Sequence, residues 1–153
     1  MGRARLRLLG RLMANKTDTP RWVAAILAQA WLLPVVRIAL TSAFLIGGIQ
    51  KSMDFSGAVA EQAHFGLQPA WFWASAAIIV ELVGSALVIL GRWVWLGAGA
   101  LGVLTAVAML AANNFWTMTG HDRFAALNAF FEHLGLIAGL VLVSIMAVRP
   151  QHP

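Results

Sequence analysis

Six polar side chains are candidates for a ligand-binding site or a buried polar core in this otherwise apolar sequence: Arg37, Lys51, Glu81, Asn113, Glu132 and His133. Glu81 lies in the run IIVELVGSALVILG and carries the only formal charge between Gln62 and Gly91. Thirty residues of helix span about 45 Å, which exceeds the roughly 30 Å of hydrocarbon in a bilayer. A carboxylate at that depth costs on the order of 3 kcal/mol, so we expect Glu81 to have a counter-ion or a functional role. No residue is assigned as catalytic.

The helical rise of 1.5 Å per residue indicates which charge could neutralise Glu81. If Lys51 and Pro69 mark the outer boundary of the membrane, Arg37 lies about 21 Å below it and Glu81 about 18 Å below it. We therefore predict an ion pair between Arg37 and Glu81. Two interpretations stay open, because such a pair either fixes the register of two helices or serves a substrate or a proton.

A second polar cluster is predicted nearer the outer face. Asn113 lies about 10 Å below the end of its span and Glu132 and His133 about 14 Å below Arg123, so the amide could bond the carboxylate or the imidazole. Adjacent helical residues point about 100° apart, so Glu132 and His133 cannot face the same point. The other predicted members of this outward-facing cavity are Gln50, Lys51, Glu61 and His64. The histidine spacing matches no metal-ligand motif, and no metal site is expected.

The elements that position these residues are predicted to be membrane spans. The chain is 60% hydrophobic and only 11% charged, which is not typical of a soluble domain. Charge-free runs predict four spans, at Trp31–Met53, Pro69–Gly91, Trp93–Met118 and Ala125–Val148. The expected fold is all-α: a polytopic, antiparallel four-transmembrane-helix bundle. A short outer interfacial helix is expected over 56–66, between Asp54 or Ser56 as N-cap and Gly66 as stop.

The expected organisation is a basic cytoplasmic tail and interfacial segment over 1–30, a transmembrane domain over 31–148 and a short cytoplasmic tail over 149–153. Pro34 interrupts the early apolar run, so Trp22–Leu33 is either an interfacial helix or a bent extension of the first span. Met13 is an alternative start to Met1. Small residues at four-residue intervals, Ala98 with Gly102 and Gly135 with Gly139, would permit close helix approach within the bundle or between protomers.

The distribution of basic residues predicts orientation. Only Lys51 and Arg123 fall on one side of the predicted membrane, and Arg37 lies inside a span. Eight fall on the other side: Arg3, Arg5, Arg7, Arg11, Lys16, Arg21, Arg92 and Arg149. The positive-inside rule therefore places both termini in the cytoplasm. The formal charge of +5 is concentrated beside the membrane, where it fits anionic lipid headgroups rather than nucleic acid.

Three segments together resemble the DoxX family of small four-span membrane proteins: GGIQKSMDF at the end of span one, ELVGSALVILGR at the end of span two, and NAFFEHLGLIAGLVLV in span four. The family pattern has a glycine shortly before a lysine, here Gly48 and Lys51, and an acid followed by glycines, here Glu81, Gly84 and Gly91. The resemblance implies a bacterial inner-membrane component of redox or sulfur metabolism. Some relatives are thiosulfate:quinone oxidoreductase subunits, and others are associated with oxidative-stress enzymes.

The expected function is a non-catalytic or cofactor-assisted subunit of a quinone-linked redox system. The chain has no cysteine, so thiol–disulfide chemistry within it is excluded and electrons must come from a cofactor or a partner oxidoreductase. A quinone would enter between helices, with Arg37, Lys51 or His133 donating to its carbonyl and Glu81 or Glu132 handling protons. The alternatives are a membrane scaffold or assembly partner and a small proton-coupled transporter. A homo-oligomer fits either alternative.

Overall fold

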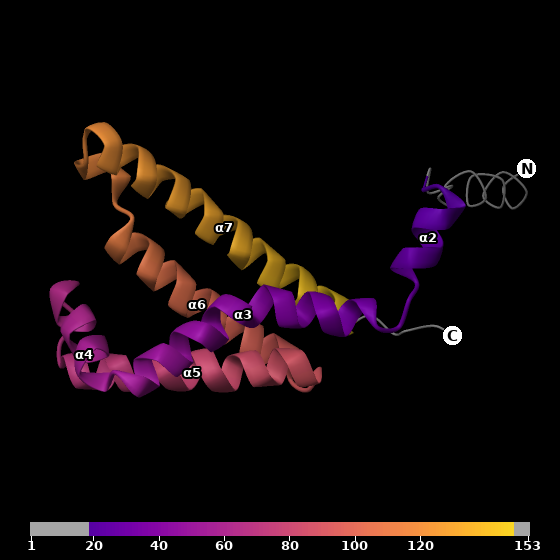
Figure 1. Cartoon of the computed structure of the whole chain (residues 1–153), viewed down its shortest axis with the longest axis horizontal. Coiled ribbons are helices and arrows are strands. Elements are labelled where there is room, and N and C mark those ends of the chain that lie inside the picture. Colours follow the sequence, from indigo (N-terminus) through magenta and orange to yellow (C-terminus); the bar gives the residue numbers. More distant parts are fainter. Residues whose placement is uncertain (1–18, 149–153) are drawn as a thin grey trace, which may run out of the picture. The chain divides into compact units, whose positions relative to one another are not determined.

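The computed structural model describes residues 19–148, and every regular element within them is a helix (Figure 1). Residues 1–18, with both candidate start methionines, and the predicted tail 149–153 lie outside the described residues. The chain divides into two compact units between Leu33 and Pro34. The first unit contains α2 (Arg21–Leu27), a separate short helix within the segment for which the sequence left two interpretations open.

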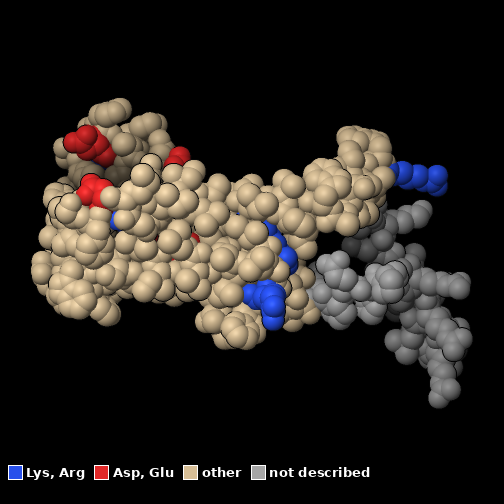
Figure 2. Space-filling model, turned by 60° about the horizontal axis from the view of Figure 1, so that its bottom comes forward, with Lys and Arg blue, Asp and Glu red and all other residues tan. Residues whose placement is uncertain are grey.

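Among the described residues, four helices are long and apolar enough to cross a membrane, which confirms the all-α polytopic fold. They are α3 (Leu32–Met53), α5 (Ala70–Leu90), α6 (Val94–Ala112, continued by the 3-10 turn η1, Phe115–Thr117) and α7 (Gly120–Val148). Most of the surface visible in Figure 2 carries no formal charge, as expected for surface that faces lipid. The third span runs over Val94–Thr117, as the predicted Trp93–Met118 requires, but its α-helix ends at Ala112 and the 3-10 turn follows. The fourth span begins five residues earlier than predicted.

The predicted outer helix is present as α4 (Phe55–His64). Asp54 is its N-cap: a carboxylate oxygen accepts hydrogen bonds from the backbone N–H of Gly57 and the hydroxyl of Ser56, both at 2.9 Å. Gly66 follows the helix with a φ of +74°, which glycine adopts without steric cost. These donors hold the pKa of Asp54 below its usual value. The helix is therefore fixed at both ends, and it packs on α5.

Helices α5 and α6 form a tight hairpin at Gly91, which has a φ of +70°. Their backbones meet at Gly84 and Gly97, where a Cβ on Gly97 would lie 2.6 Å from the Gly84 carbonyl oxygen. The glycines singled out by spacing behave differently: a Cβ on Gly139 would lie 3.0 Å from a Leu40 methyl, whereas Gly102 and Gly135 have open space. One core joins all four spans through Phe44, Val88, Val94, Ala98, Leu101, Leu140 and Val143.

Gly97→Ala should destabilise the hairpin by about 1–3 kcal/mol, because the added methyl forces two backbones apart. Gly102→Ala on the same helix is the matched control and should be neutral or slightly stabilising, since nothing lies within 4 Å of the new methyl. Unfolding in mild detergent measures both. Equal midpoints for the two variants would contradict the close contact.

The lowered pKa of Asp54 gives a pH dependence with a definite sign. The carboxylate stabilises α4 at pH values above its unfolded pKa of about 3.9, and this contribution is lost as pH falls through the lower folded value. Asp54→Asn keeps an acceptor but cannot titrate. Below about pH 4, hydrogen exchange in α4 should therefore become faster in the wild type relative to Asp54→Asn, so the ratio of the wild-type rate to the variant rate should rise. A ratio that stays constant through this range would contradict the role of the carboxylate.

Candidate functional site

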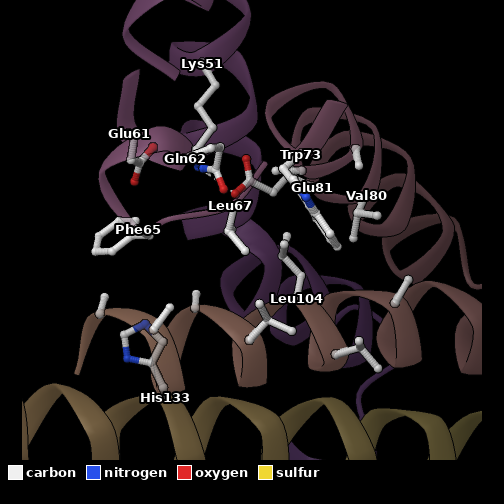
Figure 3. A pocket seen from close by; sticks show the side chains of 18 of the residues that line it. Lys51, Glu61, Gln62, Phe65, Leu67, Trp73, Val80, Glu81, Leu104 and His133 are labelled. Atoms are coloured by element: carbon white, nitrogen blue, oxygen red, sulfur yellow. Dashed lines mark hydrogen bonds and ion pairs between the residues drawn. The ribbon is translucent and has the colours of Figure 1, made fainter. Parts of the chain in front are cut away.

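The buried acid is paired with Lys51, not with Arg37. Lys51 Nζ lies 2.7 Å from Glu81 Oε1, and this is the one ion pair among residues 19–148 (Figure 3). Glu81 is 7% exposed, and Lys51 is half-buried. The predicted pair between Arg37 and Glu81 is therefore wrong.

The antiparallel register of α3 and α5 explains the error. Gly48 faces Leu82, and the Arg37 guanidinium contacts Gly91 at the other end of α5. Because ten residues of α5 separate Gly91 from Glu81, Arg37 is about 15 Å along the helix from the carboxylate. Lys51 is level with the middle of α5 rather than with its first residue, Ala70, so Lys51 and Pro69 do not mark one common level.

One glycine on α3, Gly48, lets the helices approach closely enough for this ion pair. A Cβ on Gly48 would lie 2.8 Å from a Leu82 methyl and 3.1 Å from Glu81 Cβ, so a side chain there would push α3 away from α5. A Cβ on Gly47 would lie 3.5 Å from Glu81 Oε2, an ordinary contact. That oxygen is buried without a hydrogen-bond partner, as is the Ser85 hydroxyl one turn further along α5. The α3–α5 interface thus contains polar groups that only a close helix pair can shelter.

The ion pair opens on one side into a cavity of about 810 Å³. Helices α5 and α6 touch near their turn and diverge towards α4 (Figure 1). Residues of both helices line the cavity. Its polar end contains Lys51, Glu81, Glu61 and Gln62, as Figure 3 shows. Its walls are apolar and mostly contributed by α6: Trp73, Ala76, Ala77, Val80, Trp95, Leu96, Gly99, Ala100, Val103, Leu104, Val107, Ala108, Ala111 and Ala112. This combination suits an amphipathic ligand with a small polar head.

His133 is the contribution of α7 to this cavity. Its Nδ1 lies 2.6 Å from the Ala129 carbonyl oxygen, and since a carbonyl only accepts, Nδ1 carries the proton. When the ring carries only this proton, Nε2 is a hydrogen-bond acceptor. Glu132 is exposed and does not line the cavity, because adjacent helical residues diverge. Asn113 lines the cavity without a hydrogen bond to His133 or Glu132.

The fold therefore gathers Lys51, Glu81, Asn113 and His133 at one cavity and leaves Arg37 and Glu132 outside it. Glu61 lines the cavity as predicted, whereas His64 packs edge-on against Phe65 instead. Trp73 and Trp95 are not among the predicted site residues, yet both line the walls. In the sequence, the feature that indicates this cavity wall is the set of small residues on α6, which leaves space beside the tryptophans. Among residues 19–148, no three potential ligands are grouped for a metal ion.

A double-mutant cycle should show that the two charges depend on each other. Lys51→Met leaves a buried, uncompensated carboxylate and should cost about 3 kcal/mol or more. Glu81→Leu should cost more than Glu81→Gln, which keeps an acceptor for Lys51. The double variant Lys51→Met/Glu81→Leu should be markedly more stable than the sum of the single losses predicts. Additive losses in detergent unfolding would mean that the pair is not coupled.

Comparison with known proteins agrees with this architecture. A family model described as DoxX matches residues 32–114, which contain α3 to α6 and most of the cavity lining. The chain is also 26% identical over 118 residues to the inner membrane protein YphA of Escherichia coli (strain K12), covering 77% of this chain and 84% of that protein. No solved structure matches the chain. Since the family model covers more than half of its length, this integral membrane protein belongs to the DoxX family.

Proposed function

We propose that the protein is a membrane subunit of a quinone-linked redox system and that its cavity holds the quinone. The observation that carries this proposal is the apolar cavity of about 810 Å³ with a buried Lys51–Glu81 pair at one end. A quinone has the matching form, a flat neutral head with two oxygens and an apolar tail. Val103 and Val107 line the cavity and are exposed, so the cavity is open at this apolar wall, which fits entry from the lipid phase.

The polar side chains fit the two oxidation states of such a head. The Lys51 ammonium donates one hydrogen bond to Glu81 and has two further N–H groups that can donate to a carbonyl oxygen. His133 Nε2 is an acceptor and suits a hydroxyl. A bound quinone supplies reversible transfer of two electrons and two protons. The side chains of the cavity would orient the head, and Glu81 and Glu61 would hold protons. Glu132 and Arg37 do not line the cavity, so Glu132 is no longer a candidate for holding protons and Arg37 is no longer a candidate for binding the carbonyl.

The proposed role is accessory rather than catalytic. The chain has no cysteine that could take electrons from a thiol or sulfur substrate. An oxidoreductase in or at the membrane would supply the electrons, and a second copy of this chain is an alternative partner. The name of the relative YphA supports the bacterial inner membrane as the location. By the positive-inside rule, Arg92 in the α5–α6 turn supports a cytoplasmic location for this end of the bundle.

Titration with a short-chain benzoquinone tests the proposal. Trp73 and Trp95 line the cavity, so bound quinone should quench part of the tryptophan fluorescence of protein in lipid nanodiscs, with a saturable component. Ala108→Phe fills the cavity and should remove that component. Lys51→Met should weaken binding about tenfold or more, the effect of losing one hydrogen bond from a charged donor.

The control is Leu110→Phe on the same helix, at an exposed position that does not line the cavity. Leu110→Phe should leave the saturable component unchanged. Quinone dissolved in the lipid can reach the surface around Leu110, but such contact gives only unspecific quenching that does not saturate. Quenching that never saturates, or that persists in Ala108→Phe, would contradict a quinone site. The scaffold and the proton-coupled transporter would then be the better hypotheses.

A further inference from the structure

At the end of the bundle opposite α4, Arg37 occupies a position that the quinone proposal does not use. Its guanidinium contacts Gly91 so closely that any Cβ there would collide with Nη1. Its Nε is buried without a hydrogen-bond partner. Within residues 19–148, no carboxylate lies within ion-pair distance of this guanidinium. A half-buried arginine with unused donors indicates a missing anionic or acceptor group.

Arg92 adds a second cation at the same place. It follows Gly91 directly, so its backbone is one residue from the atoms that Arg37 contacts, and its side chain is exposed. Glu81 is ten residues away along α5 and is bonded to Lys51. On the face shown in Figure 2, the acidic side chains and the largest basic patch lie well apart. This end of the bundle therefore has two positive charges and no neutralising acid among the described residues.

The level of the two arginines in the bilayer indicates which anion would meet them. Gly91 and Arg92 form the turn between two spans, and Arg37 is beside that turn rather than at the depth of Glu81. The next residue, Trp93, is 70% exposed, as is typical of tryptophan at the headgroup level. We propose that Arg37 and Arg92 form a binding site for the phosphate of an anionic phospholipid. Guanidinium groups bind phosphate through paired hydrogen bonds, and Gly91 has no side chain to obstruct Arg37.

A simpler role for Arg37 makes a different prediction. The positive guanidinium lies at the carbonyl end of α5 and would stabilise that helix end in any lipid. A phospholipid site instead makes stability depend on lipid charge. The decisive measurement is therefore the difference in stability between anionic and zwitterionic lipid, not stability itself.

The test uses the full chain in mild detergent, with phosphatidylglycerol or phosphatidylcholine added and thermal unfolding and native mass spectrometry as readouts. Phosphatidylglycerol should stabilise the wild type and stay bound, and phosphatidylcholine should do neither. Arg37→Gln and Arg92→Gln should each weaken phosphatidylglycerol binding about tenfold. Arg37→Lys should be intermediate, because it keeps the charge but not the paired donors.

Arg123→Gln is the matched control, since Arg123 is exposed at the opposite end of the bundle and has the same charge. Arg123→Gln should bind phosphatidylglycerol like the wild type. The basic residues near the N-terminus are the same in all variants, so they cannot cause a difference between them. An equal loss in Arg123→Gln would show diffuse attraction and overturn the site. Unchanged lipid dependence in both Arg37→Gln and Arg92→Gln would also overturn it, and so would equal stabilisation by inorganic phosphate. None of these outcomes depends on quinone binding, so the two proposals can fail separately.

Discussion

A carboxylate in the middle of an apolar helix constrains the rest of this structure. Hydrocarbon cannot solvate Glu81, so a cation must reach it within the bundle, and the cation is Lys51 at 2.7 Å. That contact requires α3 to lie directly against α5, which Gly48 permits because it has no side chain. The ion pair in turn forms the polar end of the cavity, beside Glu61 and Gln62 of α4.

The cavity results from a contrast between the two ends of the α5–α6 hairpin. Near Gly91 the helices touch through Gly84 and Gly97, and further away they diverge. Helix α4 covers part of the resulting space and contributes Glu61 and Gln62. A polar end formed by an ion pair and an apolar wall formed by small residues therefore meet in one site. The same hairpin presents Arg92 at its turn, beside Arg37, so each end of the bundle has its own polar chemistry.

The sequence predicted the elements well, because membrane spans are specified by local composition. Four apolar runs, the short helix after Asp54 and the tight turn at Gly91 all depend on residues close together in the chain. The candidate site was predicted in part: Lys51, Glu81, Asn113 and His133 line one cavity, but Arg37 and Glu132 do not. Depth counted from Lys51 placed Arg37 beside Glu81, and this failed because Lys51 is level with the middle of α5 and not with Pro69.

Composition and spacing by themselves determined that four segments within residues 19–148 are long and apolar enough to cross a membrane and that the buried acid needs a partner. The reason is that burial of each group in hydrocarbon has a cost that does not depend on the arrangement of the helices. The identity of the partner was decided only by tertiary structure. It depends on the register of α3 against α5, which is set by the contacts of Gly48 with Leu82 and of Arg37 with Gly91. Whether a conspicuous charge faces the cavity, the lipid or the headgroups likewise follows from helix rotation and crossing, which the order of residues along one helix does not specify.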